Sequence, residues 1–272
     1  MFKKKIITLP VSFDNSPSCQ AAYIEAGNGP TLLMLHGFFG EATCWLPLME
    51  NLQQHFRCIS LDLLAFGDSS QPKIIYDVAT EVTFLRHFIQ QLKLEQFYLL
   101  GHSFGAWVSS AYALQFPHKV RGLILAGPAG IRDDSFCGRY DHLRPLLWDT
   151  PLIDFALNLA TPVAKIVGKK ADIEQIWSFR KNLMNQPVAR SFLLTRLRPE
   201  DAVDTVEKDI HKLPMPALVI AGELDETIPL WHSETYAQEI PNAQLKIIPG
   251  ADHSLPQNYH QEMVSLITEF LG

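Results

Sequence analysis

Short apolar runs alternate with segments of helical spacing along most of the chain, and this alternation predicts an α/β fold. Fully apolar runs such as 31–35 and 120–126 are typical of strands buried on both faces of a parallel sheet. Strands are expected at residues 4–13, 18–26, 31–35, 56–61, 97–100, 120–126, 217–221 and 245–248. Helices are expected at about 42–54, 80–92, 106–116, 230–239 and 259–271. We therefore expect a mostly parallel, eight-stranded sheet flanked by helices.

The first strands of this sheet are expected to run antiparallel. Residues 27–30 read Gly-Asn-Gly-Pro, which is a tight-turn signal between the second and third apolar runs. Close spacing of two strands around a glycine-rich turn favours antiparallel pairing at the start of the sheet.

The strand pattern stops between about Ile131 and Asp209. This stretch instead contains helical segments that five prolines interrupt: Pro145, Pro151, Pro162, Pro187 and Pro199. An all-helical stretch inside a βα alternation indicates an insertion. We expect residues 1–130 and 210–272 to form an α/β core domain and residues 131–209 to form a helical cap, or lid, over the strand ends. Aromatic residues in this stretch are more typical of the cap's own core than of substrate contacts, so no substrate-binding residue is predicted.

Composition and charge exclude several classes of protein. With 272 residues, 47% of them hydrophobic and 19% charged, the chain is an ordinary globular sequence that can bury a large core. A formal net charge of −6 argues against a nucleic-acid partner. No apolar run approaches 18 residues, so no membrane span is expected.

The cysteines and the first residues indicate a cytoplasmic protein. Lys3, Lys4 and Lys5 precede an apolar stretch that Pro10 interrupts, and no small-residue cleavage site follows, so we expect no signal peptide. The four cysteines are scattered without the spacing of a metal site: Cys19, Cys44, Cys58 and Cys137. This usage favours a reducing compartment, and no metal site is expected.

The stretch from Phe97 to Phe116 carries the clearest chemical signal. A short apolar strand is followed at once by Gly101-His102-Ser103-Phe104-Gly105 and then by a helical pattern that Pro117 ends. So sharp a turn holds the serine at its tip, above the carboxyl end of the strand. Glycines suit the two flanking positions because any Cβ there would meet the neighbouring strand or helix. This is the G-x-S-x-G nucleophile elbow in its strand–turn–helix context.

Two backbone N–H groups are expected to form an oxyanion hole next to Ser103. The N–H of Phe104 lies at the start of the elbow helix, where a helix binds negative charge. The loop His36-Gly37-Phe38-Phe39-Gly40 follows the third strand, and its glycines allow the N–H of Phe38 to approach a ligand. His36 itself is interpreted as a structural histidine that bonds loop backbone, since histidines play such roles often.

A serine hydroxyl needs a base to take its proton, and that base needs an anion to orient it and stabilise its charged form. Ser103, Asp225 and His253 each follow the carboxyl end of a predicted strand. In an open α/β sheet these ends share one edge, at which ligands bind. The chain order Ser, Asp, His is the order that this architecture uses. We therefore predict Ser103 as nucleophile, His253 as base and Asp225 as the orienting acid.

Other candidates for the base and the acid are less well placed. His55, His87, His118 and His260 lie on or beside helices with polar neighbours. His102 is expected to point away from the site if Ser103 points into it. For the acid, the alternatives are Glu223, Glu226 and Asp133, and Asp252 is interpreted as a turn residue.

At this level of detail the chain resembles the α/β-hydrolase fold superfamily, in the branch that has a helical cap after the sixth strand. The resemblance covers essentially the whole chain. Four ordered motifs carry it: His36-Gly37, Gly101-His102-Ser103-Phe104-Gly105, residues 222–229, and Gly250-Ala251-Asp252-His253. The 62–72 loop departs from the family's Asp-x-x-Gly-x-Gly-x-Ser turn, because Ala65 replaces the first glycine. If that position requires a positive φ, Ala65 costs about 1 kcal/mol.

The triad and the resemblance together predict a serine hydrolase that cleaves a carboxylic ester or similar acyl bond through an acyl-enzyme. The aromatic residues of the expected cap favour a small apolar substrate. The resemblance implies no metal and no cofactor. Cleavage of a carbon–carbon bond, a lactone or a thioester, and perhydrolysis, are alternatives on the same triad, and a ligand-binding receptor is an alternative on the same fold. A serine nucleophile argues against the dehalogenase and epoxide-hydrolase relatives, which use aspartate. The oligomeric state is left open, with a homodimer as one option.

Overall fold

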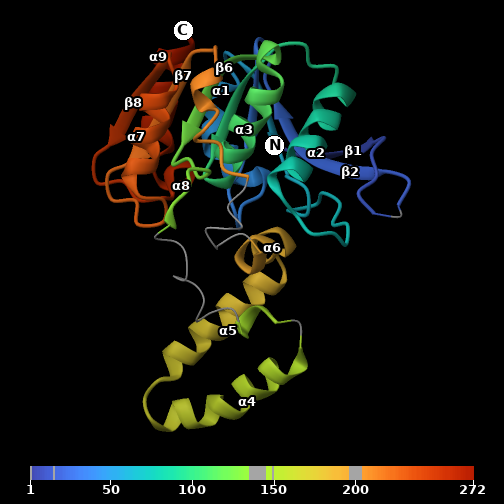
Figure 1. Ribbon diagram of the computed structural model, residues 1–272, viewed down its shortest axis with the longest axis vertical. Helices are drawn as coiled ribbons and strands as arrows, with labels where there is room; N and C mark the ends of the chain where they lie inside the picture. Colours follow the sequence, from blue (N-terminus) through green and yellow to red (C-terminus); the bar gives the residue numbers. More distant parts are fainter. Residues whose placement is uncertain (1, 15, 135–144, 149, 196–203) are drawn as a thin grey trace. The chain divides into compact units, whose positions relative to one another are not determined.

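The computed structural model describes residues 2–14, 16–134, 145–148, 150–195 and 204–272 (Figure 1). By their internal contacts these residues divide into two compact units. Unit 1 contains Met1–Arg132 and Asp204–Gly272, and unit 2 contains Asp133–Val203. The sequence places the boundaries at residues 131 and 209, and the function of unit 2 as a cap stays a prediction.

Unit 1 is built on one sheet that has eight strands in the described part of the chain. The strands are β1 (Lys4–Leu9), β2 (Cys19–Ala26), β3 (Thr31–Leu35), β4 (Arg57–Leu61), β5 (Phe97–His102), β6 (Val120–Ala126), β7 (Ala217–Gly222) and β8 (Ala243–Ile248). Their spatial order is β1-β2-β4-β3-β5-β6-β7-β8. β1 and β2 pair antiparallel, as do β2 and β4, and every later pair is parallel. The predicted fold class and the antiparallel start of the sheet are confirmed.

The turn at 27–30 does not join two paired strands, although the sequence suggests a hairpin there. β4 lies between β2 and β3 in the sheet, and β3 pairs in parallel with β4 and β5. A fully apolar strand such as β3 is stabilised most when other strands pair with both of its edges and helices cover both of its faces. The central position of β3 therefore outweighs the local preference for a hairpin.

Helices cover both faces of the sheet. α1 (Leu46–Leu52) and α9 (His260–Leu271) pack together on one face, where their apolar residues join those of the central strands in one core. α2 (Val78–Gln91) and α3 (Phe104–Gln115) pack together, and α3 contacts β5 and β6. α7 (Leu230–Glu239) contacts β7 and β8. Shorter helical segments are η1 (Ala42–Trp45), η2 (Pro117–Lys119), η6 (Ile210–Lys212) and α8 (Leu255–Asn258).

Two predicted helices begin at different residues in the structure. The helix expected at 42–54 is divided into the 3₁₀ segment η1 and the helix α1, whose second residue is Pro47. Proline lacks an N–H group and is tolerated in a first turn, so it favours a new helix start. α2 begins at Val78 rather than near Thr80, because Asp77 is its N-cap and accepts a hydrogen bond from the Thr80 N–H at 2.7 Å.

Ala65 adopts the left-handed conformation that the family's glycine would favour. Its φ is +62°, it is buried, and its N–H donates to the Ser70 carbonyl at 2.9 Å. The positive φ is therefore present, and it strains the backbone of a residue that has a Cβ.

We expect Ala65→Gly to raise the free energy of unfolding by about 0.5 kcal/mol. Relief of roughly 1 kcal/mol of strain is partly offset by the greater freedom of glycine in the unfolded chain and by the lost methyl group. Ala79→Gly, in the first turn of α2, is the control and is expected to destabilise by up to about 1 kcal/mol. Urea denaturation measures both. Equal destabilisation by the two substitutions would contradict this account of Ala65.

Glu81 is a carboxyl group with no exposed surface, on the first turns of α2. Its Oε2 accepts a hydrogen bond from the Leu64 N–H at 3.1 Å, and its Oε1 has no partner among the described residues. Burial raises the pKa of Glu81 well above its ordinary value. The carboxyl group is therefore held in its neutral form inside the folded protein.

This pKa makes stability depend on pH in a predictable direction. Above the ordinary pKa of glutamate the unfolded chain loses the Glu81 proton while the folded chain keeps it, so stability falls with a slope approaching about 1.4 kcal/mol per pH unit. Glu81→Gln is expected to flatten that slope, matching the wild type near pH 4 and exceeding its stability at pH 8. Urea titrations across this range test it, with Glu95→Gln at an exposed position as control. A Glu81→Gln protein that loses stability at pH 8 would exclude this explanation.

Unit 2 is helical in its described part. α4 (Pro151–Ile166) and α5 (Lys170–Met184) lie side by side, and α6 (Pro187–Thr195) packs against α5 (Figure 1). The guanidinium of Arg180, 3% exposed as a residue, joins α5 to α4 by donating to Asp154 at 2.7 Å and 3.1 Å. The predicted absence of strands in this stretch holds for its described residues.

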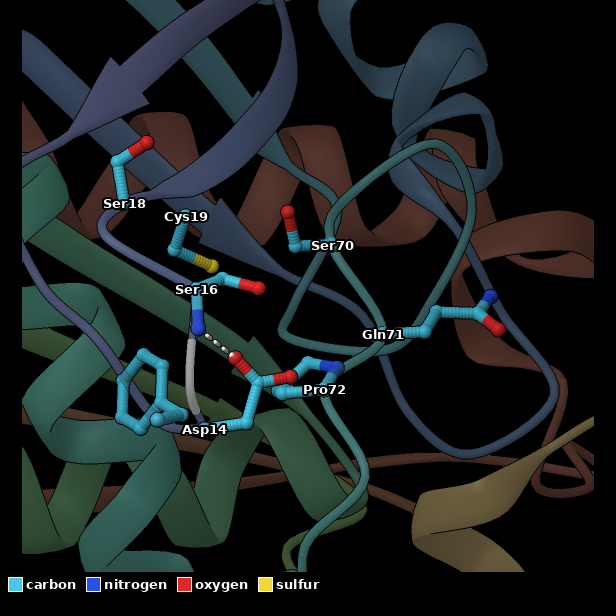
Figure 2. Close-up of a pocket in the computed structure, with 8 residues that line it drawn as sticks. Asp14, Ser16, Ser18, Cys19, Ser70, Gln71 and Pro72 are labelled. Atoms are coloured by element: carbon cyan, nitrogen blue, oxygen red, sulfur yellow. Dashed lines mark hydrogen bonds between the residues drawn. The ribbon is translucent and has the colours of Figure 1, made fainter.

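A small polar cavity of about 140 Å³ lies beside the β1–β2 connection (Figure 2). It is lined by Phe13, Asp14, Ser16, Ser18, Cys19, Ser70, Gln71 and Pro72. Within it, the Ser16 N–H donates to the Asp14 carboxylate at 2.8 Å. None of the residues that the sequence predicts for catalysis lines this cavity.

Candidate active site

The turn between β5 and α3 is as sharp as the sequence predicts. β5 ends at His102, α3 begins at Phe104, and Ser103 alone connects them. A Cβ on Gly101 would lie 2.4 Å from the Gly105 carbonyl oxygen, and a Cβ on Gly105 would lie 2.3 Å from the Leu35 carbonyl oxygen. Real Cβ atoms do not approach backbone so closely, so the steric reason predicted for both glycines is confirmed.

Ser103 is held in a strained conformation by its main-chain partners. Its φ is +54°, which is unusual for a residue other than glycine. The Ser103 N–H donates to the Ala126 carbonyl at 2.9 Å, while the Ser103 carbonyl accepts from Ala106 and Ala129 at 3.1 Å and 3.2 Å. Strain of this kind persists where the surroundings over-determine it, which is typical of functional sites.

The structure brings Ser103, His253 and Asp225 into one hydrogen-bonded chain. The Ser103 Oγ lies 2.9 Å from the His253 Nε2, and the His253 Nδ1 lies 2.6 Å from the Asp225 Oδ2. The other carboxylate oxygen of Asp225 accepts from the N–H groups of Thr227 and Ile228 at 2.9 Å and 2.8 Å. The three side chains come from the loops after β5, β8 and β7, which end at the same edge of the sheet.

Burial and hydrogen bonding assign a role to each ring nitrogen of His253. The Asp225 side chain is 2% exposed, whereas that of His253 is 20% exposed. A carboxylate accepts hydrogen bonds only, so the Nδ1–H of His253 donates to Asp225. The Nε2 is then left as the acceptor for the Ser103 hydroxyl. This arrangement can remove a proton from Ser103 and stabilise the resulting imidazolium.

Phe38 and Phe104, the predicted oxyanion donors, lie beside one another next to the serine. Their rings stack at 4.3 Å between centroids with an interplanar angle of 13°. Phe104 directly follows Ser103, and a Cβ on Gly37 would lie 2.9 Å from the Ser103 Cβ. The loop that carries Phe38 thus approaches Ser103 as closely as packing permits. The assignment of their N–H groups to an oxyanion hole stays a prediction.

His36 bonds main-chain groups of two loops, as the sequence predicts. It is fully buried, its Nδ1 lies 2.8 Å from the Gly37 carbonyl, and its Nε2 accepts from the Leu63 N–H at 3.1 Å. The Nδ1 therefore carries the proton. Burial lowers the pKa of His36, which keeps the ring neutral.

Two residues near His253 are missed by the sequence reasoning. His102 is expected to point away from the site, but its Nε2 lies 2.8 Å from the His253 carbonyl and the two rings are 4.8 Å apart between centroids. A Cβ on Gly127, whose φ is +49°, would lie 3.3 Å from both the Asp225 Oδ2 and the His253 Nδ1. The sequence pattern that could have indicated a role for Gly127 is its position directly after the buried strand β6.

The alternative acids occupy other positions. Glu223 accepts from the Gly250 N–H at 2.8 Å, and Asp252 accepts from the Ser254 N–H at 2.8 Å, as a turn residue does. Asp133 belongs to unit 2. Among the acidic residues whose hydrogen bonds are described, Asp225 is the one bonded to His253.

The described residues contain no group of three or more His, Cys, Asp or Glu side chains arranged to hold a metal ion. Cys19, Cys44 and Cys58 are free thiols, and burial raises the pKa of Cys58 to about 12. Among the described helices, none has the length and apolar character that crossing a bilayer requires.

Comparison with protein families gives a match to the alpha/beta hydrolase fold over residues 30–256. The chain belongs to this family. The match spans both units of the structure and contains Ser103, Asp225 and His253.

Individual members of the α/β hydrolase family match nearly the whole chain. A 2-hydroxymuconate semialdehyde hydrolase from Pseudomonas sp. (strain CF600) is 30% identical over 261 residues, which cover 91% of this chain and 89% of the relative. A 2-hydroxy-6-oxo-2,4-heptadienoate hydrolase from Pseudomonas putida is 27% identical over 257 residues, covering 91% of each chain. The solved structure of a thermophilic esterase from Thermogutta terrifontis superposes with a TM-score of 0.74 at 23% identity, covering 98% of each chain.

Proposed function

We propose that this α/β hydrolase is a serine hydrolase that cleaves a carboxylic ester, or a similar acyl bond, of a small apolar substrate. The observation that carries the proposal is the continuous hydrogen-bonded chain from Ser103 through His253 to Asp225. It is supported by the strained backbone of Ser103 at the tip of the elbow and by the hydrogen-bond distance from its hydroxyl to the imidazole. Geometry of this kind activates a hydroxyl that is otherwise a poor nucleophile at neutral pH.

In the first half of the reaction, the Ser103 Oγ forms a bond to the carbonyl carbon of the ester while its proton passes to the His253 Nε2. The carbonyl oxygen takes the electron pair of its π bond, and we assign the N–H groups of Phe38 and Phe104 to stabilise it. The C–O bond to the alcohol then breaks, and the alcohol leaves with the proton from His253.

The second half repeats these steps with water. His253 takes a proton from a water molecule whose oxygen bonds to the carbonyl carbon of the acyl-enzyme. When the bond between that carbon and the Ser103 Oγ breaks, the acid is released and Ser103 regains the proton from His253. Asp225 keeps the imidazole in one tautomer throughout and stabilises its charged form.

A carbon–carbon hydrolase is the second candidate, and a specific observation favours it. The 30% identical relative is named for hydrolysis of 2-hydroxymuconate semialdehyde, and it aligns with 91% of this chain. The same serine, histidine and acid would act on a ketone carbonyl, and a carbon fragment would then leave in place of the alcohol.

A substrate panel separates the two candidates. Values of kcat/KM for p-nitrophenyl acetate and longer aryl esters are compared with those for a ring-cleavage dienoate, with lactone and thioester substrates as further members. Ester hydrolysis at least about a hundredfold more efficient than dienoate cleavage supports the first candidate, and the reverse ratio replaces it with the second. A fluorophosphonate probe that fails to label Ser103 would exclude both and favour a ligand-binding receptor.

We also assign unit 2 as the cap of this enzyme, the part expected to determine substrate shape. The proposal is supported by its insertion between β6 and β7 of the core. It is tested by the substrate profile, because substitutions in unit 2 should change kcat/KM ratios between substrates without changing probe labelling of Ser103.

His102 is expected to act as a positioning residue for His253. Burial and the adjacent imidazole of His253 lower the pKa of His102 to about 3, so the ring is neutral and its Nε2–H donates to the His253 carbonyl. His102→Leu removes this donor and should lower kcat about tenfold with little change in KM, because the base is displaced while substrate contacts remain. His102→Gln places an amide N–H near the same carbonyl and should restore most of kcat. An equal decrease in kcat in both variants would mean that the hydrogen bond from His102 does not position His253.

A further inference from the structure

The segment 36–42, which we call the 36–42 loop, is bonded at both of its ends to the loop that follows β4. At its start, the His36 Nε2 accepts from the Leu63 N–H at 3.1 Å. At its end, the Ala42 N–H donates to the Asp62 Oδ1 at 2.5 Å. The N–H group that we assign to the oxyanion hole lies between these two ends. All of these residues belong to unit 1.

The centre of the 36–42 loop also contacts the loop after β4. The Gly40 N–H donates to the Gly37 carbonyl at 3.1 Å, which closes a turn that contains Phe38. The Phe38 ring stacks on the ring of Phe66 at 6.3 Å between centroids, with an interplanar angle of 27°. Phe66 is buried in the loop after β4. The position of the Phe38 N–H therefore depends on a neighbouring loop as well as on its own turn.

The Asp62 carboxylate connects the loop after β4 to β1. The Asp62 side chain has no exposed surface, and its Oδ2 accepts from the Asp68 N–H at 2.9 Å. The same oxygen lies 2.8 Å from the Nζ of Lys4, a residue of β1. A buried carboxylate is stable when a cation pairs with it and its oxygens accept hydrogen bonds. Lys4 therefore stabilises the group that holds the end of the 36–42 loop.

The Lys4 ammonium group joins three carboxylates. Besides Asp62, its Nζ lies 2.8 Å from the Glu41 Oε2 and 2.9 Å from the Asp68 Oδ2. Glu41 is part of the 36–42 loop, so Lys4 holds this loop directly as well as through Asp62. Burial lowers the pKa of Lys4, but hydrogen bonds to the three carboxylates outweigh it and raise the pKa above its ordinary value. The side chain is therefore charged at neutral pH.

We infer that Lys4 is a positioning residue for the oxyanion hole. Without its ammonium group the three carboxylates would repel one another, and Glu41 would move away with the 36–42 loop. The Phe38 N–H would then leave the place where the carbonyl oxygen gains charge. An oxyanion donor is effective when the fold holds it at that place before the reaction begins. The inference rests on the proposed function, in which the Phe38 N–H stabilises the oxyanion.

Steady-state kinetics of Lys4→Met on the best ester substrate test the inference. Removal of one oxyanion donor costs about 10²–10³-fold in kcat, so displacement of one should cost about tenfold. KM should change less than about twofold, because the donor acts on charge that develops in the transition state. Lys4→Arg keeps a cation and should restore most of kcat. The matched control is Lys5→Met, because Lys5 is the next residue of β1, pairs with Glu25 at 2.6 Å and should be dispensable for kcat.

Affinity for a trifluoromethyl ketone is a measurement that a purely structural role of Lys4 would leave unchanged. The Ser103 Oγ bonds to the ketone carbon, its proton passes to His253, and the carbonyl oxygen becomes the oxyanion of the adduct. The inhibition constant should rise about tenfold in Lys4→Met, in step with the decrease in kcat. Thermal unfolding shows whether the variant is folded at the assay temperature.

Glu41→Gln keeps the inference testable if Lys4→Met does not fold. The Glu41 side chain is 44% exposed, so the substitution should be tolerated, and loss of its ion pair should lower kcat several-fold. The double variant with Lys4→Met should be no worse than Lys4→Met alone, because the two residues act through one contact.

Three results would overturn the inference: wild-type kcat and inhibition constant in Lys4→Met, wild-type kcat in Glu41→Gln, or an equal decrease in Lys4→Arg and Lys4→Met. Failure of the proposed function would differ from all three. In that case the wild-type protein would hydrolyse no substrate of the panel and a fluorophosphonate would not label Ser103, which would refute the inference as well.

Discussion

Replacing Ser103 with alanine is expected to lower kcat by about 10⁴-fold or more on whichever substrate the wild type turns over best. The reason is that the Oγ is the atom 2.9 Å from the His253 Nε2, and no acyl-enzyme can form without it. The fold should be unaffected, because the main-chain hydrogen bonds that hold residue 103 do not involve the side chain. Alanine at a φ of +54° carries strain similar to that of serine.

Ser109→Ala is the matched control for this substitution. Ser109 is fully buried on the same helix, α3, and its Oγ donates to the Gly105 carbonyl at 2.7 Å. Its replacement should change kcat by less than about twofold, because this back-bond within a helix contributes little. Covalent labelling with a fluorophosphonate probe is a second measurement. The Ser109→Ala enzyme should be labelled, and the Ser103→Ala enzyme should not. A Ser103→Ala enzyme that keeps a tenth of wild-type turnover would rule out Ser103 as nucleophile.

Replacing Asp225 with asparagine is expected to lower kcat by about 10⁴-fold without unfolding the protein. One carboxylate oxygen of Asp225 accepts from the N–H groups of Thr227 and Ile228. The carbonyl oxygen of an asparagine must take over these two hydrogen bonds, so its NH₂ group is directed at the His253 Nδ1. That nitrogen then has to accept, and the ring proton moves to Nε2. An imidazole in this tautomer cannot take the proton of Ser103.

Asp252→Asn is the control, because the same change is made one residue before His253. Asp252 is exposed and accepts from the Ser254 N–H, which an asparagine also does. Its kcat should stay within about twofold of the wild type. Thermal unfolding of both variants shows whether any loss is structural. If Asp225→Asn retained more than about a hundredth of wild-type turnover, the base would not depend on this carboxylate, and another acid would have to be sought.

Much of the core could be predicted because its strands are apolar and its glycines are required locally. Helix α7 has the predicted bounds, and β6 begins and ends where its apolar run does. The elbow could be predicted from five consecutive residues. Gly101 and Gly105 are needed there because a Cβ at either position would collide with neighbouring backbone. The sequence pattern predicts a start of α2 near Thr80, whereas the helix begins at Val78, because the capping role of Asp77 depends on a hydrogen bond to the Thr80 N–H that only coordinates reveal.

Contacts between residues that are far apart in the chain could be predicted less well from the sequence. Alternation along a strand predicts that neighbouring side chains lie on opposite sides, and it therefore points His102 away from the site if Ser103 points into it. The loop after β8 folds back over β5, and the His253 carbonyl meets the His102 ring there. The sequence around Gly127 likewise does not show that this residue lies next to Asp225 and His253. These three residues come from three separate loops. No pattern within a single segment encodes such a meeting.

Patterns along the amino-acid sequence were enough to predict the α/β alternation, the helical insertion, the sharp turn at Ser103 and the positions of Asp225 and His253 after the ends of two strands. These follow from local rules: apolar periodicity sets element type, and the absence of a Cβ permits the tight turn. The folded coordinates were needed to show that β4 separates β2 from β3 and which nitrogen of His253 faces which partner. The physical reason is that pairing order and hydrogen-bond direction depend on distances between segments, and those distances exist only in the folded chain.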